Sequence, residues 1–328
     1  MSNAKEPLVS VIIPSYNAAK FLKTSVGSVL KQSYKNVEAV IVNDGSADNT
    51  LEVAKELAKK YKNIVVATKE NGGLGFARNT GFKHAHGEYY YLLDADDSIT
   101  EHCIERLVET AVKEDADVVC TMIDQSLTKE KLGKKPVRTV SGVEALCEDL
   151  NMHIPTASCG RLYHKSIFEK EKFTNIRYAE DFEFNIRFWP KAKRVAILDD
   201  YTYLYAITPG SMMNSPYSEK KSEIISTILK LEKMSKDKKY SDKVCNTMRS
   251  GCYLQALATL LNLYETGVKS FPKDYRKLAR IAKRNSRYTF FNKEVDMLHR
   301  KFALCSMVSV RLTLWMIKRA GRKAQNEQ

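Results

Sequence analysis

The stretch "LVSVIIPSYNAAKFLKTSVGSVLKQSYKNVEAVIVND", residues 8–44, predicts a strand, a helix and a second strand. The runs "LVSVII" (8–13) and "VEAVIV" (37–42) are short, apolar and rich in β-branched residues, as strands buried on both faces are. Between them, apolar residues of 18–32 recur at helical spacing. This strand–helix–strand unit is the building block of parallel α/β sheets.

The same alternation continues to residue 122. Further strands are predicted at 63–68, 88–93 and 116–122, and further helices at 47–61, 73–85 and 99–114. Residues 1–215 are therefore expected to form a Rossmann-like α/β domain, with an open, mainly parallel sheet and helices on both faces.

Polar residues mark several of the expected helix starts. Ser46 or Asp48 is predicted to cap the helix over 47–61. Capping-box spacing joins Ser98 to Glu101 and Ser141 to Glu144, which predicts helix starts at both places.

The last third of the chain differs in pattern and in charge. Residues 216–328 show helical spacing and hold 25 Lys/Arg and 10 Asp/Glu, a net charge of +15, whereas residues 1–215 have a net charge of −1. A helical, basic region is therefore expected to follow the α/β domain, with different partners. In its last helical segment, 301–323, the apolar run 303–317 is too short and, with Arg311 inside it, too charged to span a membrane. Two alternatives stay open: it lies on an anionic membrane surface, or it packs as a cap on the catalytic domain.

Cysteine usage and the N-terminal sequence bear on location. The seven cysteines are odd in number and contain no C-x-x-C pair, and residues 1–14 lack the features of a secretory signal. A cytoplasmic protein is expected, with a peripheral position on the inner face of the plasma membrane as an option.

The stretch "GEYYYLLDADDS", residues 87–98, sends three carboxylates out of an apolar strand: Asp94, Asp96 and Asp97. In an open α/β sheet, ligands bind at the carboxyl ends of the strands. Crowded carboxylates repel one another unless a cation neutralises them, and oxygen ligands favour Mg²⁺ or Mn²⁺. Asp44, after the strand at 37–42, falls at the same edge.

A glycine-rich segment supplies a possible phosphate partner. In "NGGLGFARNTG" (71–81) the glycines allow close approach of the backbone, a helix begins, and Arg78 can make bidentate contacts. The dinucleotide-binding fingerprint does not fit, because Arg78 occupies the place of its third glycine.

Four ordered segments together resemble family 2 glycosyltransferases with the GT-A fold. They are "VSVIIPSYNAAKFLKTSVGSVLKQSY", "VEAVIVNDGSADNT", "GGLGFARNTGF" and "GEYYYLLDADD". The resemblance is strong over about 8–120, the nucleotide-sugar part, and looser over 121–215, the acceptor and base part. It implies an inverting hexosyl- or N-acetylhexosaminyltransferase that uses a nucleotide diphosphate sugar, usually UDP-linked.

The resemblance also assigns roles within the nucleotide-sugar part. Pro14, Tyr16 and Asn17 would line the nucleoside pocket, Asp44 would accept from the uracil N–H, and Arg78 would lie near the base and the diphosphate. The residues of "DADD" would bind the ion and the donor, with Asp96 on the metal directly, Asp94 on the ribose or the metal, and Asp97 as a further candidate ligand.

An acceptor hydroxyl also needs a general base. In "YAEDFEFNIRF" (178–188) the resemblance implies that Asp181 is that base, although acids at a helix start are stabilising in any protein. The segment 203–215 resembles a mobile flap over the donor, closed by Tyr205 and Ser211, with Ala206 where a basic residue is common.

The acceptor is expected to be a saccharide or a polyprenyl-linked saccharide. A nucleotidyltransferase, which shares the sheet and the acid cluster, is the first alternative, but no lysine- and glycine-rich loop follows the first strand. Nucleic-acid binding, suggested by the pI of 9.3, ranks lower because no binding motif is present.

Overall fold

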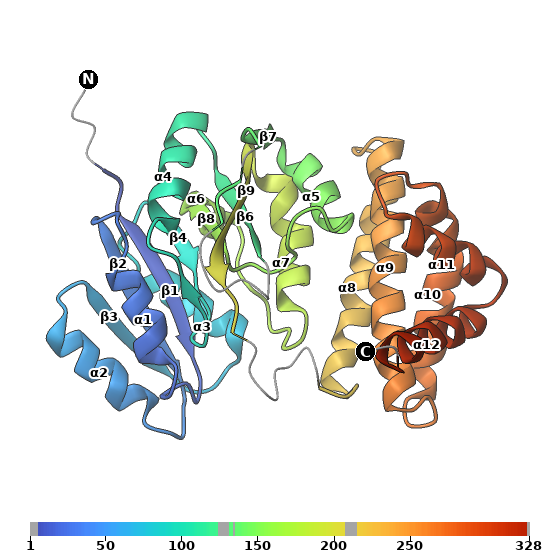
Figure 1. Cartoon of the computed structure of the whole chain (residues 1–328), viewed down its shortest axis with the longest axis horizontal. Coiled ribbons are helices and arrows are strands. Elements are labelled where there is room, and N and C mark those ends of the chain that lie inside the picture. The colour runs from blue at the N-terminus through green and yellow to red at the C-terminus, as the bar shows by residue number, and fades with distance from the viewer. Residues whose placement is uncertain (1–5, 124–130, 134, 207–214, 327–328) are drawn as a thin grey trace. The chain divides into compact units, whose positions relative to one another are not determined.

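A computed structural model describes residues 6–123, 131–133, 135–206 and 215–326 of the chain (Figure 1). The chain divides into two compact units. Unit 1 comprises Met1–Leu146 and Ile154–Ser211, and unit 2 comprises Cys147–His153 and Met212–Gln328. The functional division after residue 215 stays a prediction.

Unit 1 is built on a sheet whose first half is parallel. Strands β1 (Val9–Ser15), β2 (Val37–Asp44), β3 (Ile64–Lys69) and β4 (Tyr89–Leu92) lie in the order β3-β2-β1-β4. All three pairings between them are parallel. Strands β1, β2 and β4 are buried along their whole length, as their continuous apolar runs predict.

Helices cover both faces of this sheet. The core on one face joins Val11 and Ile13 of β1 to side chains of α1 (Leu22–Leu30) and α4 (Cys103–Glu114). Ile12, which points the other way along the strand, meets α3 (Leu74–His84) at Gly81, where a Cβ would lie 2.3 Å from Ile12 Cγ2. Helix α2 (Thr50–Lys60) packs beside β3. The predicted α/β class and its mainly parallel sheet are confirmed.

The second half of the sheet is mixed. Strand β8 (Arg161–His164) inserts antiparallel between β4 and β6 (Val118–Ile123), and β9 (Val195–Leu204) pairs parallel with β6. Two short strands, β5 (Ser98–Ile99) and β7 (Arg138–Val140), pair antiparallel with β9. The described residues thus form one sheet of nine strands.

Helix starts followed the expected polar signals unevenly. Ser141 and Glu144 do form the predicted capping box before α5 (Gly142–Leu150), with Ser141 N–H donating to Glu144 at 2.8 Å. The prediction at Ser98 was wrong, because Ser98 and Ile99 pair with β9 and α4 begins only at Cys103. Helix α2 begins after Asn49, so Asp48 bonds the Thr50 N–H from one residue further out.

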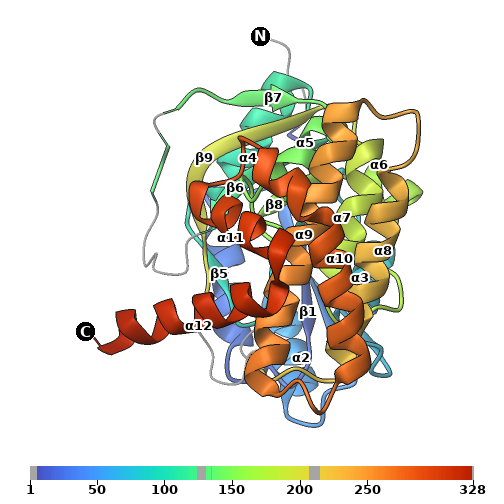
Figure 2. The same cartoon turned by 90° about the vertical axis from the view of Figure 1, so that its right-hand side faces the viewer.

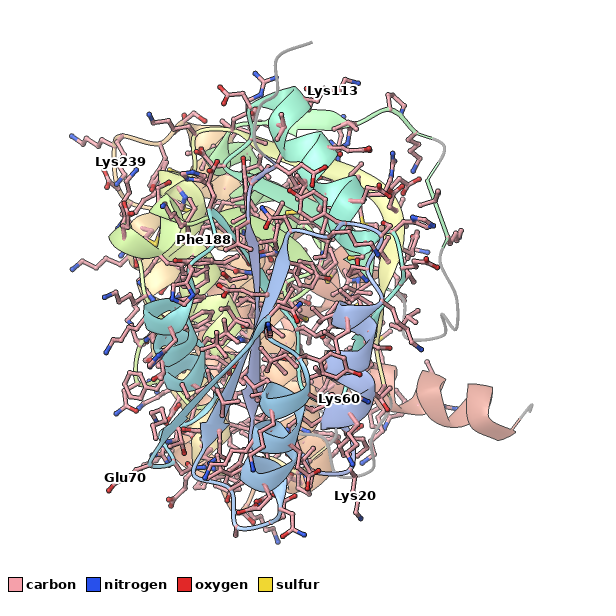
Figure 3. The ribbon with its side chains drawn as sticks, turned by 90° about the vertical axis from the view of Figure 1, so that its left-hand side faces the viewer. Lys20, Lys60, Glu70, Lys113, Phe188 and Lys239 are labelled. Atoms are coloured by element: carbon pink, nitrogen blue, oxygen red, sulfur yellow. The ribbon has the colours of Figure 1, made fainter. Side chains whose placement is uncertain are left out.

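The rest of unit 1 positions the predicted base. Helix α6 (Ser166–Lys170) follows β8, and α7 (Glu180–Phe188) precedes a short 3-10 helix at Trp189–Lys191. Phe188 has no exposed surface, whereas Lys20 and Lys60 are exposed; all three are labelled in Figure 3.

Unit 2 is helical among the described residues. After a 3-10 turn at Lys220–Ser222 come α8 (Glu223–Met234), α9 (Asp242–Thr266), α10 (Pro272–Phe291), α11 (Met297–Val308) and α12 (Val310–Asn326). Helices α9 and α10 lie side by side (Figure 2).

The apolar segment predicted over 301–323 is broken in the structure, because Ser309 adopts extended backbone between α11 and α12. Within the part of the chain that the structure describes, no helix is long and apolar enough to cross a membrane.

Candidate active site

The turn after β1 presents one exposed ring above a fixed backbone. Tyr16 is 54% exposed, and Asn17 takes a positive φ of 51°. The loop after β2 holds this turn: Ser46 Oγ accepts from Asn17 N–H at 3.0 Å, and Asn17 Oδ1 accepts from Ala47 N–H at 2.9 Å. Pro14 is buried within β1, so the turn can offer a base mainly the Tyr16 ring.

Asp44, at the end of β2, is 3% exposed and organises the glycine turn. Its Oδ1 accepts from Lys69 Nζ at 2.7 Å and from Gly72 N–H at 3.0 Å, and its Oδ2 accepts from Gly73 N–H at 2.8 Å. A carboxylate has about four acceptor positions, so one remains for a further donor. The contact of Asp44 with a nucleobase N–H stays a prediction.

The acids that follow β4 have different environments. Asp94 is partly exposed and Asp96 is of intermediate exposure, whereas Asp97 is 3% exposed. Asp97 accepts from Tyr203 Oη–H at 2.5 Å and from Ala206 N–H at 2.7 Å. Both Asp97 oxygens are thereby engaged inside the protein.

Arg78 joins the two halves of the predicted site. Its Nη2 donates to Asp94 Oδ1 at 3.1 Å and its Nη1 donates to Asp181 Oδ1 at 2.5 Å. Glu180 Oε1 lies 3.9 Å from the same Nη1. One guanidinium therefore holds the acid that ends β4 and the acid that begins α7 against each other.

Arg78 lies beneath these acids, with 0% of its side chain exposed. Gly81, one turn later, lets α3 approach β1 closely, and the Arg78 guanidinium lies 5.1 Å from the centre of the Phe173 ring. The expectation that Arg78 lies near the base and the diphosphate stays a prediction; in the structure its guanidinium is buried among carboxylates.

Burial and charge shift the pKa values around this centre. Burial alone would lower the pKa of Arg78, but Asp181 and Asp94 raise it well above its usual value. Burial raises the pKa of Asp94 against the influence of Arg78, and the charges of Asp181 and Asp96 raise it further. Burial also raises the pKa of Glu180 to about 7, helped by the charge of Asp181. Burial is therefore the main cause of the raised pKa values of Asp94 and Glu180, and the neighbouring acids add to it.

The carboxylates at this edge supply only some of the oxygen ligands that a hard divalent ion needs. Asp94 and Asp96 offer oxygen ligands with some exposure, but no group of three potential ligands stands ready among the described residues. A site that binds an ion through one or two carboxylates, with water and substrate phosphates as the other ligands, is typical of Mg²⁺. The metal roles of Asp94, Asp96 and Asp97 stay predictions.

Several residues of the site gave no clear signal in the sequence. Lys69 and the Gly73 N–H hold Asp44, Phe173 packs on Arg78, and Tyr203 bonds Asp97 while its Oη accepts from Asp94 N–H at 3.3 Å. The proximity of Lys69 to the glycine turn is the one hint that was available. In the expected flap, residues 207–214, including Ser211, lie outside the described residues.

Comparison with known proteins bears on this site. The family model "Glycosyl transferase family 2" matches residues 10–172. The glycosyltransferase GlyG of Streptococcus pneumoniae is 30% identical over 226 residues, which cover 64% of this chain and 74% of GlyG. This chain belongs to glycosyl transferase family 2. Membership favours glycosyl transfer over the nucleotidyltransferase alternative.

Other members of family 2 are similar over comparable lengths. EpsJ of Bacillus subtilis, described as an uncharacterized glycosyltransferase, is 34% identical over 225 residues, and the match spans 64% of both chains, just under two thirds. The cholesterol galactosyltransferase of Borreliella burgdorferi is 30% identical over 243 residues, or 68% of each chain.

Solved structures confirm the GT-A-like fold. S. aureus TarS 1-349, in complex with UDP-GlcNAc, superposes with a TM-score of 0.69 at 18% identity and covers 97% of this chain and 92% of its own. The mannosyltransferase PcManGT of Pyrobaculum calidifontis, in complex with GDP-Man and Mn²⁺, has a TM-score of 0.54 at 15% identity and covers 95% and 88%. At these identities the similarity shows the fold alone.

Proposed function

We propose that this glycosyltransferase moves a hexosyl or N-acetylhexosaminyl group, with inversion, from a UDP-linked donor to a hydroxyl of a saccharide or polyprenyl-linked saccharide. The observation that carries the proposal is the Arg78 centre, which consists of Arg78 and the carboxylates of Asp94, Asp181 and Glu180. It fixes Asp181, the predicted base, beside Asp94, the predicted donor and metal residue, although the two come from distant parts of the sequence. A base and a donor site must be adjacent for direct transfer.

Asp181 has the exposure and the fixed position that a general base needs. Its side chain is 23% exposed, and Arg78 holds one of its oxygens, Oδ1. In the proposed reaction the acceptor oxygen attacks the anomeric carbon, the bond from that carbon to the diphosphate oxygen breaks, and the hydroxyl proton passes to the Asp181 carboxylate. The leaving diphosphate departs from the opposite face of the sugar, which inverts the anomeric centre.

Asp96 and Asp94 are the residues we propose to hold Mn²⁺ or Mg²⁺. A bound ion of this kind supplies charge stabilisation to the departing diphosphate. Arg78 is proposed here as a positioning residue rather than a phosphate ligand, because its guanidinium is fully buried. Asp97 is proposed to fix the β4 turn through Tyr203 and Ala206.

Tyr16 and Asp44 are proposed to form the nucleoside side of the site. The exposed Tyr16 ring offers a stacking surface for a base, and Asp44 keeps one acceptor position beyond its three donors.

A thermal-shift panel tests donor and cofactor together. UDP-, GDP- and dTDP-sugars are added to the chain with and without Mn²⁺, and the UDP-sugars are expected to raise the melting temperature only when Mn²⁺ is present. Asp96→Asn should lose this shift and donor turnover, while Asp115→Asn, at an exposed left-handed helix end that Asn tolerates, should keep both. Stabilisation that needs no metal, or none by any nucleotide sugar, would contradict the proposal.

A further inference from the structure

Exposed apolar side chains gather at the end of unit 2. Of the fourteen large hydrophobic residues that are exposed among the described residues, eight lie between 291 and 316. They are Phe291, Met297, Leu298, Leu304, Val308, Leu312, Trp315 and Met316. Exposed apolar residues concentrated in one segment favour an interaction site, whereas residues scattered singly over a surface need no explanation.

Helix α12 carries large apolar side chains on its exposed face as well as on its buried face. Leu312, Trp315 and Met316 are 46%, 48% and 39% exposed and fall on one helical face. The opposite side packs into unit 2, where Leu314 is fully buried. Arg319 extends the exposed face, and its guanidinium lies 5.2 Å from the Trp315 ring.

Helix α11 repeats this arrangement. Met297, Leu298, Leu304 and Val308 are exposed at helical spacing, with Val308 at 76%, whereas Ala303 is fully buried on the other side. Two apolar faces therefore follow each other across the break at Ser309.

Buried hydrogen bonds join α11 to α9 and α12 to α11 within unit 2. Tyr253 Oη on α9 bonds Ser306 Oγ on α11 at 3.0 Å, and Ser306 Oγ donates to Thr313 Oγ1 on α12 at 3.0 Å. All three side chains have 0% exposure. The faces opposite these contacts are consequently held toward solvent as a permanent feature of the fold.

The Lys, Arg, Asp and Glu residues within α11 and α12 have one sign of charge. Residues 297–326 contain seven Lys/Arg and no Asp or Glu. Lys301 and Arg311 are exposed beside the apolar residues of α11 and α12. Apolar residues with a tryptophan, interleaved with arginine and lysine, are the composition of helices that lie in a membrane interface.

We propose that the exposed faces of α11 and α12 dock onto an anionic lipid bilayer, with the apolar side chains in the headgroup–acyl boundary and the basic side chains among the phosphates. No helix of the described residues could span a bilayer, so the contact is peripheral. A second copy of the chain is a poorer partner, because a symmetric contact would place these like charges against each other. Duplex nucleic acid supplies the negative charge but no hydrocarbon for Leu304 or Val308.

Vesicle sedimentation of the 328-residue chain tests the proposal. Vesicles of phosphatidylcholine alone are compared with vesicles that include about 30% phosphatidylglycerol, since each basic residue near an anionic surface adds about fivefold to binding. At least tenfold tighter binding to the anionic vesicles, weakened by added salt, is expected. Equal binding to both compositions, or to neither, would overturn the proposal.

Two double variants separate the apolar from the charged contribution. Trp315→Ser with Met316→Ser should weaken binding about tenfold or more through lost apolar burial, while the control Val112→Ser with Leu229→Ser, exposed elsewhere, should not. Arg311→Glu with Arg319→Glu should abolish the preference for anionic lipid, and Lys59→Glu with Lys60→Glu on α2 should retain it. Circular dichroism verifies the fold of each variant.

Tryptophan emission gives a direct readout. The chain has two tryptophans, and Trp189 is fully buried, so a blue shift on addition of anionic vesicles reports Trp315. Trp315→Phe should bind vesicles and lose the shift. If Trp315→Ser with Met316→Ser instead converts a dimer to a monomer without changing vesicle binding, the face serves self-association and the proposal fails. Equally tight, salt-sensitive binding to duplex DNA would overturn it as well.

Discussion

Two buried ionic centres, one in each unit, are opposite in composition. In unit 1 a single cation, Arg78, faces the carboxylates of Asp94, Asp181 and Glu180. In unit 2 a single carboxylate, Glu232, accepts from Arg284 Nε at 2.7 Å and from Asn285 Nδ2 at 2.9 Å. Arg249 lies 3.7 Å from the same Glu232 side chain.

The two centres also differ in the direction in which the pKa of their carboxyl groups is shifted. Burial alone would raise the pKa of Glu232, but hydrogen bonds from Arg284 and Asn285 lower it below the usual 4.5. Around Arg78 the balance is reversed, and burial raises the pKa of Asp94 in spite of the arginine. Glu232 in unit 2 is held by basic and amide donors, whereas Arg78 in unit 1 lies among three carboxylates, two of which are partly exposed. Partly exposed carboxylates can bind a divalent cation together with water and substrate phosphates.

The largest effect is expected from Asp181→Asn. An amide keeps the shape of the side chain but cannot take the acceptor proton, so sugar transfer should fall about a thousandfold. Donor binding should persist, as measured by the Mn²⁺-dependent thermal shift. Asp115→Asn is the matched control and should transfer normally. Full transfer activity in Asp181→Asn would show that Asp181 is not the general base and that the centre in unit 1 does not supply it.

Arg78→Ala should destabilise unit 1 by about 3–5 kcal/mol, because it removes a fully buried side chain and leaves three carboxylates without their cation. Arg78→Lys keeps the charge but loses the two-pronged geometry that joins Asp94 to Asp181, so it should lower kcat more than it raises KM. Urea unfolding and steady-state kinetics measure these effects, with Arg187→Lys as the comparison at another ion pair of unit 1. If Arg78→Lys has wild-type kcat, Arg78 serves the fold alone, as Glu232 does.

Glu232→Gln tests, through the pH dependence of the unfolding free energy, whether the centre in unit 2 serves stability. Since the folded-state pKa of Glu232 is lowered, its stabilisation is present above about pH 4.5 and is lost as pH falls through the folded-state value. The variant should lose about 1–2 kcal/mol at neutral pH, a modest figure because Arg284 is 45% exposed. Its unfolding free energy should also change less than that of the wild type from about pH 6 to about pH 3. Identical pH profiles would show that Glu232 is not the titrating group.

Tyr203→Phe should have the smallest effect on transfer and should destabilise unit 1 by about 1–2 kcal/mol, because Asp97 keeps its bond from Ala206 N–H while the hydroxyl's bonds to Asp97 and from Asp94 N–H are lost. Tyr201→Phe, two residues away on β9, provides the control. A thousandfold loss of transfer in Tyr203→Phe would show that Asp97 acts in the reaction rather than in fixing the β4 turn.

The sequence predicted those parts of the fold whose signals are local. Buried β-branched runs indicated β1, β2 and β6, and the Ser141–Glu144 capping box formed as expected. The start of α4 could not be predicted, because pairing of Ser98 with Leu204 depends on a strand far along the chain. Insertion of β8 between β4 and β6 likewise arises from tertiary pairing that no local pattern records.

In the candidate site, too, the sequence predicted only what local signals record. The motifs indicated which residues carry charge, but not which of them is buried. Arg78 was expected near the base and the diphosphate, and its burial follows from the close approach of α3 to β1 at Gly81 and from its contacts with the acids that begin α7. Lys69 was missed because its role depends on the position of Asp44 across neighbouring parallel strands.

The central claim is that the acid excess around Arg78 receives a divalent ion together with a nucleotide sugar. Anomalous diffraction from crystals grown with Mn²⁺ and a UDP-sugar tests it most directly. The expected result is a manganese peak bound by Asp96 or Asp94 and by the donor diphosphate, with the anomeric carbon facing Asp181. A bound donor with no manganese at these carboxylates, or a donor seated away from Asp181, would contradict it.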